Sequence, residues 1–423
     1  MQPINAEKIY ILPGVEENPH ARARMDRLRP FIRAEATERI TDEQLAQIIK
    51  ERNLLQRPRH GMTGTIRPLV FFNVFRFDDS DETRARRKQA FPDLFKQDLL
   101  KLHSYGGFDW RDTGSREWRV KTGLVCQPAW AMHSLVGCHF RCAYCSLGWF
   151  HNIMLNLEDF IARLDGWLAG VQNQTLYQYD NWTDIACFEP EYGMSKLLVE
   201  YFAERQKEYL EVYVGKSDEI DCLLNLHHRR HTTVCWSLSA RTQASRIERG
   251  TAPMMARIQA ARRCQEAGYH VRIRFSPIVP IRNWRDENRE MIEALFAAVT
   301  PEVITFEPIR FLNYDAMRTS IGPDLLDPEF LEGMKSTMGT KHPGGSEIPD
   351  YLRLKMYRFI IDEIERVSPE APYALCREER KTWEALAPDF ARHGMNPDHY
   401  VCNCGPTSAP GNPLLAAYKP HRD

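Results

Sequence analysis

The sequence predicts an α/β fold from about residue 120 onward, either a full or partial (β/α) barrel or a doubly wound sheet. Short apolar runs typical of strands alternate there with segments of helix length, and such alternation indicates βαβ units around a parallel sheet. The 423 residues, 43% of them hydrophobic, suffice for a buried core and exclude a wholly disordered chain. In either fold, catalytic side chains are expected at the C-terminal ends of the strands.

The elements of this region follow from local apolar patterns. The expected strands cover residues 131–135, 184–188, 211–214, 233–238, 270–277, 303–307 and 372–376. The expected helices between them cover residues 157–170, 194–209, 252–267 and 285–298.

The residues before the barrel indicate an α+β extension. Strands are expected at 8–12 and 68–77, and a helix with an acidic first turn at 42–55. We therefore expect an extension over 1–115, a barrel over 116–376 and a C-terminal tail over 377–423.

Charge and cysteine content narrow the class further. The 56 Lys+Arg residues balance 57 Asp+Glu residues, which argues against a general polyanion binder. Eleven unevenly spread cysteines do not fit a secreted disulfide framework and favour metal or thiol chemistry in a reducing compartment. The sequence shows neither a leader pattern nor an apolar run long enough for a bilayer, so we expect a cytoplasmic protein without membrane contact.

The main chemical motif is VGCHFRCAYCSL, with Cys138, Cys142 and Cys145 spaced Cys-x3-Cys-x2-Cys after the first expected barrel strand. Three thiolates at this spacing can each bind a different iron of a [4Fe-4S] cluster and leave the fourth iron open for a ligand. The alternatives are a structural zinc site or three unrelated thiols. Zinc usually takes four ligands in two separated pairs, and no matching imidazole pair lies nearby.

With the aromatic Tyr144 before its last cysteine, this motif resembles the signature of the radical S-adenosylmethionine (SAM) superfamily. The resemblance implies a partial (β/α)6 barrel in which SAM binds the open iron. It also implies a flavodoxin- or ferredoxin-like one-electron donor. Reductive cleavage of SAM then gives a 5′-deoxyadenosyl radical that abstracts a hydrogen atom from the substrate. We predict that Tyr144 contributes to SAM binding and catalysis.

Within that superfamily the chain resembles the spore photoproduct lyase family over most of residues 8–376. Similar segments include KIYILP, VGKSDEIDCLLNLHHRRHTTVCWSLSA, IERGTAPMMARIQAARRCQEAGYHVRIRFSPIVPI and MYRFIIDEIERVSPEAPYAL. The resemblance implies that Lys216 and Ser237, at expected strand ends, contact SAM. Glu189, also at an expected strand end, is a further candidate for SAM binding, with helix capping or an ion pair as the alternative.

The chain also departs from that family. The position of the family's hydrogen-donating cysteine holds Tyr192 here, which we predict as a further catalytic residue. The family's relay position, immediately after the third motif cysteine, holds Ser146. The basic hairpin that reaches toward DNA in the family is reduced to residues 338–346, where only Lys341 and His342 offer positive charge. These differences weaken the expectation of duplex DNA binding.

The C-terminal region contributes three more cysteines. Cys376 ends the last expected strand, and Cys402 and Cys404 follow in YVCNCGP. They could ligate an auxiliary cluster, donate a hydrogen atom or form a redox pair, or they could be inert thiols. The sequence shows no fourth ligand for a cluster, so we predict that one of the three is the replacement hydrogen donor.

Three functions are compatible with these patterns. The first is a radical SAM enzyme with lyase-like activity on a pyrimidine lesion or another nucleobase-containing substrate. The second is a radical SAM lyase, dehydratase or epimerase acting on a small metabolite. The third is a non-catalytic iron–sulfur redox protein, which would leave the barrel and the open iron unused.

Overall fold

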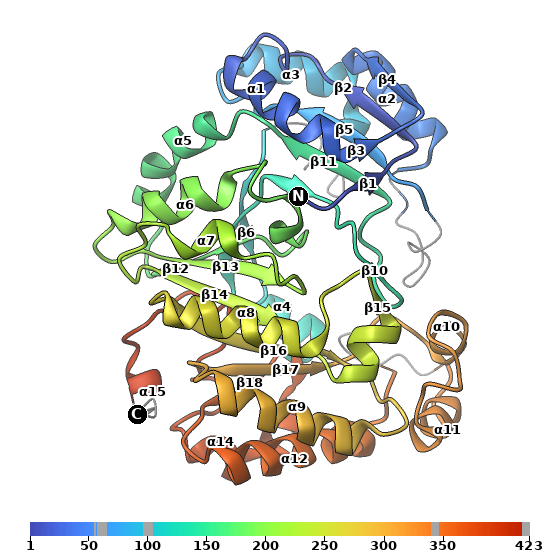
Figure 1. Cartoon of the computed structure of the whole chain (residues 1–423), viewed down its shortest axis with the longest axis vertical. Coiled ribbons are helices and arrows are strands. Elements are labelled where there is room, and N and C mark those ends of the chain that lie inside the picture. The colour runs from blue at the N-terminus through green and yellow to red at the C-terminus, as the bar shows by residue number, and fades with distance from the viewer. Residues whose placement is uncertain (55, 57–65, 96–104, 340–346, 417–423) are drawn as a thin grey trace.

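A computed structural model describes the chain except for residues 55, 57–65, 96–104, 340–346 and 417–423. Figure 1 shows the N-terminal elements at one end of the molecule and helices α12 and α14 at the opposite end. Among the described residues, no helix is both long and apolar enough to cross a membrane. Lys341 and His342 of the reduced hairpin lie outside the described residues.

An eight-stranded sheet forms the barrel wall, in the order β18-β17-β16-β14-β13-β12-β8-β6. All neighbouring pairs are parallel except β6 with β8 at one edge. This is the predicted partial barrel of α/β type, with one added antiparallel strand. Its strands are β6 (Phe108–Arg111), β8 (Ala129–Met132), β12 (Leu176–Tyr179), β13 (Tyr209–Gly215), β14 (Thr232–Ser237), β16 (His270–Ile278), β17 (Ile304–Pro308) and β18 (Tyr373–Leu375).

One predicted strand is wrong. Residues 184–188 include a short 3-10 helix, Ile185–Phe188, and the second parallel strand of the wall is β12 instead. Both segments are short buried apolar runs, and such runs do not distinguish a strand from a buried turn by periodicity. The carboxylate of Asp184 accepts a hydrogen bond from the Lys216 amide, which holds the turn against the end of β13.

Helices pack against the outer face of the sheet, close to where the sequence predicts them. The second of them, α6, ends at Ala203 rather than near residue 209. The covering helices are α5 (Leu157–Ala169), α6 (Met194–Ala203), α8 (Met254–Glu266), α9 (Trp284–Ala298) and α12 (Asp350–Val367). Shorter helices are α4 (Arg116–Thr122), α7 (Asp221–Leu224), α10 (Tyr314–Ser320), α11 (Pro328–Ser336), α13 (Arg380–Ala385), α14 (Ala387–Ala391) and α15 (Pro413–Ala416).

The N-terminal extension contains a five-stranded sheet, β4-β2-β5-β11-β9. Its predicted strands and helix are present, but β9 and β11 come from the chain on either side of the cysteine motif. The cysteine loop is therefore held by the extension as well as by the barrel. The elements are α1 (Pro19–Leu28), α2 (Asp42–Glu51), α3 (Asp81–Ala90), β2 (Lys8–Ile11), β4 (Ala36–Arg39), β5 (Leu69–Asn73), β9 (Leu135–Val136) and β11 (Phe150–Met154), with a separate pair β1 (Ile4–Asn5) and β3 (Ile32–Arg33).

The inner face of the barrel is unusually polar. Alternate residues of a strand point to opposite faces of the sheet. The apolar side chains of each strand therefore pack under the helices, and the polar side chains between them face the lumen. Part of the lumen is filled by residues 400–408 of the C-terminal tail. The lumen-facing side chains include Gln178, Glu211, Tyr213, Cys235, Arg272, Arg274, Thr305 and Glu307.

Candidate active site

The cysteine motif lies on a loop between β9 and β11, and two short strands fix its course. Strand β10 (Arg141–Cys142) pairs antiparallel with β15 (Glu248–Arg249), which places Cys142 opposite Glu248. Gly148 has a positive φ of 100°, and a Cβ there would approach the Cys138 carbonyl oxygen to 2.4 Å, so only glycine fits this turn. We expected a helix after the loop, but β11 comes first and α5 follows it.

The three motif cysteines are free thiols in low-dielectric surroundings. Cys142 is buried, and Cys138 and Cys145 are partly buried. Burial, followed by the charge of Glu248, raises the pKa of the Cys142 thiol to about 12. Metal binding at this loop must therefore release thiol protons.

The donor set fits an iron–sulfur cluster. The Cys145 amide donates a hydrogen bond to the Cys142 carbonyl oxygen at 3.0 Å, and Gly148 packs against the Cys138 carbonyl oxygen, so the loop folds the three cysteines into one neighbourhood. In the part of the chain that the structure describes, no three His, Cys, Asp or Glu side chains converge on a single metal ion. A cube-shaped cluster does not require such convergence, because each thiolate binds its own iron.

Lys216 lies beside this loop. It follows β13 directly, and its Nζ lies 6.0 Å from the centroid of the Tyr144 ring and donates a weak hydrogen bond to the Ser276 carbonyl oxygen at 3.5 Å. Its positive charge favours the thiolate forms of Cys142 and Cys145. The structure thus brings the predicted SAM-binding lysine to the predicted cluster loop.

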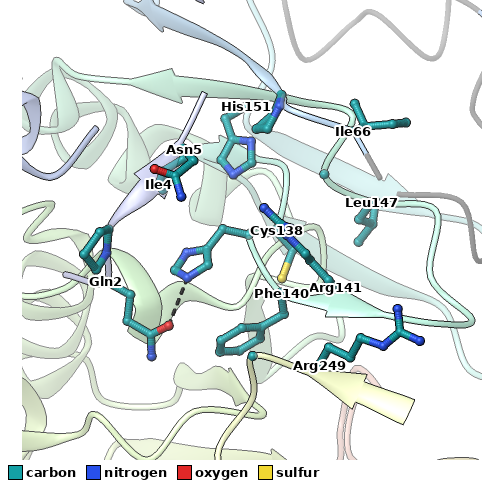
Figure 2. Close-up of a pocket in the computed structure, with 15 residues that line it drawn as sticks. Gln2, Ile4, Asn5, Ile66, Cys138, Phe140, Arg141, Leu147, His151 and Arg249 are labelled. Carbon is teal, nitrogen blue, oxygen red and sulfur yellow. Dashed lines mark hydrogen bonds between the residues drawn. The ribbon is translucent and has the colours of Figure 1, made fainter. Parts of the chain in front are cut away.

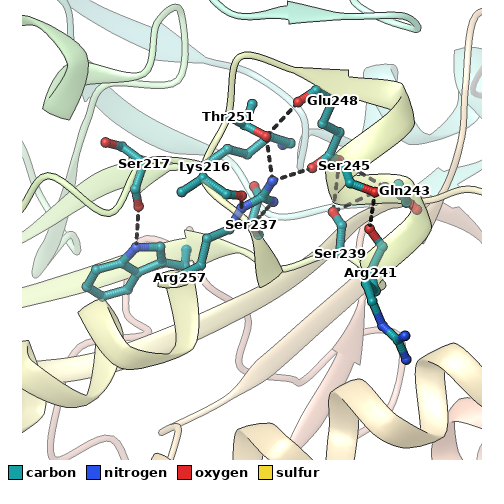
Figure 3. A network of polar contacts seen from close by, with 12 residues as sticks. Lys216, Ser217, Ser237, Ser239, Arg241, Gln243, Ser245, Glu248, Thr251 and Arg257 are labelled. Carbon is teal, nitrogen blue, oxygen red and sulfur yellow. Dashed lines mark hydrogen bonds and ion pairs between the residues drawn. The ribbon is translucent and has the colours of Figure 1, made fainter. Parts of the chain in front are cut away.

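A buried ion pair lies next to the loop, within the network of polar contacts that Figure 3 shows. Glu248 and Arg257 lie 2.8 Å apart, and the side chains of both are 0% exposed. Glu248 Oε1 accepts hydrogen bonds from the Tyr144 hydroxyl at 2.6 Å and from the Ser239 hydroxyl at 2.8 Å. Burial alone would raise the pKa of Glu248, but Arg257 and Lys216 lower it to about 2. This carboxylate fixes the orientation of Tyr144.

Ser237 is tied to the same network. It ends β14, and its carbonyl oxygen accepts a hydrogen bond from Arg257 Nη1 at 3.0 Å. Glu248, Arg257 and Asp184 were missed as organising residues in the sequence. Glu248 could have been singled out from the sequence, because it belongs to the IERGT segment. Its ion pair with Arg257 can be recognised only in the folded structure.

Two predicted site residues have structural contacts instead. The Glu189 carboxylate accepts hydrogen bonds from the amides of Gly193, at 2.7 Å, and Ser195, at 2.9 Å, and so caps the start of α6. The fully buried Tyr192 directs its hydroxyl at the carbonyl oxygens of Ser134 and Met154, at 2.8 and 3.0 Å. These contacts support the capping alternative for Glu189 and give Tyr192 a role in joining the barrel to the extension.

A cavity of about 210 Å³ lies between the cysteine loop and residues 2–5 at the start of the chain (Figure 2). Cys138 and two histidines line it, and His139 Nε2 lies 2.9 Å from the Gln2 side-chain oxygen. His151 is fully buried, and its ring nitrogens have no hydrogen-bond partner among the described residues. Burial lowers the pKa of His139 to about 4 and that of His151 to about 3, so both rings are neutral at pH 7.

The tail cysteines lie inside the barrel. Cys402 and Cys404 are buried, and Cys376 lies at the end of β18 with its sulfur 4.0 Å from Arg274 Nη2. The expectation of an appended tail is therefore incomplete, because residues 400–408 form part of the barrel interior.

A partial parallel barrel carrying a Cys-x3-Cys-x2-Cys loop defines a protein of the radical SAM type. A sequence model of the family "Spore photoproduct lyase" matches residues 127–321, which include the cysteine loop, Lys216, Ser237 and the Glu248–Arg257 pair. The chain is thus spore photoproduct lyase-like in sequence over its central part.

Curated relatives and solved structures agree with this assignment. Spore photoproduct lyases from Clostridium acetobutylicum and Bacillus subtilis are 23% and 27% identical over 194 and 191 residues, or 44% and 43% of this chain. The matches span 57% and 56% of those relatives, a little more than half of their length. A spore photoproduct lyase variant solved with dinucleoside spore photoproduct superposes with a TM-score of 0.60 at 18% identity, covering 88% of this chain and 99% of that one. Another, with bound AdoMet and the same dinucleoside, gives 0.59 at 15% identity, with the same coverage of both chains.

Proposed function

We propose that this protein is a radical SAM enzyme whose Cys138, Cys142 and Cys145 hold a [4Fe-4S] cluster. The observation that carries the proposal is that the cysteine loop lies beside Lys216 and the Tyr144–Glu248 pair. When bound, the cluster supplies the electron that cleaves SAM to a 5′-deoxyadenosyl radical.

The chain's own residues have distinct tasks in this proposal. Lys216 provides a positive charge suited to the carboxylate of SAM, and the Ser237 hydroxyl offers a hydrogen bond at the neighbouring strand end. Tyr144 lies along the loop with its hydroxyl fixed by Glu248, so its ring is held in place beside Lys216. Glu248 itself is occupied by Arg257 and hydroxyl donors and orients these groups without contacting SAM.

We propose a nucleobase-containing substrate, such as a pyrimidine lesion. The support is the similarity to lyases whose structures contain dinucleoside spore photoproduct. A small metabolite is the second candidate, and the tail favours it because residues 400–408 take up space in the barrel lumen. A flavodoxin- or ferredoxin-like donor in the cytoplasm would supply the electron, and eleven free cysteines fit such a reducing compartment.

The radical chemistry is tested on anaerobically reconstituted protein that is reduced and given SAM. We expect a cluster EPR spectrum that changes on SAM addition, together with release of 5′-deoxyadenosine. The Cys142→Ala variant should lose both signals. An intact cluster that neither responds to SAM nor yields 5′-deoxyadenosine would contradict the proposal and leave the non-catalytic redox protein.

The substrate class is tested by binding and isotope transfer. Deuterium should pass from a deuterated dinucleoside lesion into 5′-deoxyadenosine. Binding to duplex DNA, measured by fluorescence anisotropy from low to raised salt, separates a lesion in DNA from a free nucleotide-like substrate. Failure of both measurements would favour the small-metabolite alternative.

A further inference from the structure

Four cysteines from three separate parts of the chain meet inside the barrel, away from the SAM-type loop. They are Cys126, Cys376, Cys402 and Cys404, which we call the lumen cysteines. All four are free, and the structure leaves them 8% exposed or less except for the partly buried Cys376. The sequence indicated three of them, and the fold adds Cys126.

Cys126 and Cys376 are brought together by a two-stranded sheet, which we call the seam of the barrel. Strand β7 (Leu124–Val125) pairs antiparallel with β19 (Glu378–Glu379), with Val125 opposite Glu378. Continuing this register places Cys126 beside the Cys376–Arg377 peptide. Cys126 and Cys376, which are 250 residues apart in sequence, thus lie just beyond the same end of this small sheet.

The other two arrive with the tail, which is anchored at three points. Gln127, next to Cys126, donates a hydrogen bond from Nε2 to the Tyr400 carbonyl oxygen at 2.5 Å. The Asn403 amide donates to the Thr305 hydroxyl oxygen at 3.2 Å, and its side-chain Nδ2 lies 2.9 Å from Cys235 Sγ. Asn403 stands between Cys402 and Cys404, so its contacts fix both thiols in the lumen.

The tail residues pack directly against the residues that follow Cys126. Cys402 and Cys404 are joined by a side-chain hydrogen bond. A Cβ on Gly405, which follows Cys404, would lie 1.5 Å from Oε1 of Gln127, which follows Cys126. The fold therefore gathers the four lumen cysteines into one region of the barrel interior.

Two arginine side chains place positive charge next to the lumen cysteines. Arg111, on β6, is two residues from Thr113, whose hydroxyl donates a hydrogen bond at 2.6 Å to the carbonyl oxygen of Gln127, the neighbour of Cys126. The Arg111 Nε and Nη2 atoms are buried without a hydrogen-bond partner among the described residues. Arg274, on β16, lies against Cys376 and 5.4 Å from the Tyr213 ring centroid. Cations at these two positions are suited to a ligand that carries net negative charge, as an iron–sulfur cluster with four thiolates does.

We propose that Cys126, Cys376, Cys402 and Cys404 bind a second [4Fe-4S] cluster inside the barrel. Because four thiolates supply one ligand to each iron, this cluster would have no open iron, in contrast to the one at the SAM-type loop. A metal-bound thiolate has no S–H hydrogen, so the proposal replaces the hydrogen-donor role predicted from sequence for these cysteines. It does not depend on SAM cleavage and is tested separately from it.

The test is a metal count on protein that lacks the first cluster. A Cys138→Ala, Cys142→Ala, Cys145→Ala triple variant is reconstituted anaerobically, and iron, sulfide and zinc are measured per chain together with the EPR spectrum after reduction. We expect about four iron and four sulfide atoms, against about eight of each in the parent protein. Adding Cys126→Ser should abolish the remaining iron. Adding Cys264→Ala, a buried cysteine on α8 outside the group, should leave it unchanged.

Two outcomes would overturn the second cluster. One is a folded triple variant that holds no iron above background, which would return the lumen cysteines to thiol chemistry. The other is a variant that holds zinc without sulfide. If the triple variant does not fold, Cys126→Ser in the parent background decides, because loss of about half of the parent's iron is then expected, and full retention contradicts the site.

Discussion

The Glu248–Arg257 pair should contribute more to stability than any surface ion pair of this protein, and Arg257→Met tests this. Both side chains are 0% exposed and lie 2.8 Å apart, so removing the guanidinium leaves a buried carboxylate without its cation. Such a change costs about 3–5 kcal/mol. The pKa of Glu248 points in the same direction, because Arg257 and Lys216 lower it from 4.5 to about 2 in spite of burial.

The assay is urea unfolding of the metal-free protein at pH 7, followed by circular dichroism. Arg262→Met is the matched control, because Arg262 lies on the same helix, is 51% exposed and pairs with Glu266 four residues later. The control should change the free energy of unfolding by less than about 1 kcal/mol. The double variant Glu248→Gln, Arg257→Met should recover part of the loss, because no unpaired charge is then buried. Equal effects of Arg257→Met and Arg262→Met would refute the reasoning.

The same pair gives a pH dependence with a defined sign. Because the pKa of Glu248 is lower in the folded protein than in the unfolded chain, its stabilisation is present above about pH 4.5 and is lost as the pH falls toward 2. In Arg257→Met the pKa of Glu248 in the folded protein should rise toward or above its unfolded value, so the part of the acid-induced loss that Glu248 causes should shrink or change sign. A matching acid profile for the variant and the parent would contradict this assignment.

Three further predictions concern the SAM site, the lumen and the tail. Lys216→Met should weaken SAM binding by about tenfold, equal to about 1.4 kcal/mol, without changing the iron content. The affinity is measured by titrating the EPR change that SAM causes. A loss of iron instead would indicate a structural role for Lys216. Burial, only partly opposed by Arg272, raises the pKa of Glu211 to about 8, so its neutral form is favoured and stability falls as the pH rises from about 4.5 through 8. Glu211→Gln should flatten this part of the thermal stability profile, and an unchanged profile would contradict the shift. Asn403→Ala should lower the free energy of unfolding by about 1–3 kcal/mol, because it removes the side-chain hydrogen bonds that join Asn403 Oδ1 to the Thr305 hydroxyl and Asn403 Nδ2 to Cys235 Sγ. A neutral effect would mean that the tail does not depend on these contacts.

The sequence predicted those parts of the fold that depend on local patterns. The βαβ alternation, the cysteine loop and Lys216 at a strand end all follow from runs of neighbouring residues. Strand β12 was missed and residues 184–188 were misassigned because short buried runs lack a decisive period. Glu189 was placed at a strand end by the same error, whereas the structure shows its carboxylate capping the start of α6.

The role of the tail could not be predicted because it depends on contacts across the whole chain. Composition made residues 377–423 look like an addition to the barrel, yet Arg272, on β16, is fully buried and donates hydrogen bonds to the carbonyl oxygens of Asn403 and Ser408. A buried guanidinium needs acceptors for its N–H groups, so this strand of the barrel requires the tail. The contacts of Arg272 thus account for the position of two of the lumen cysteines. The arginine holds the tail in the lumen, and the tail brings Cys402 and Cys404 to the seam where Cys126 and Cys376 already lie.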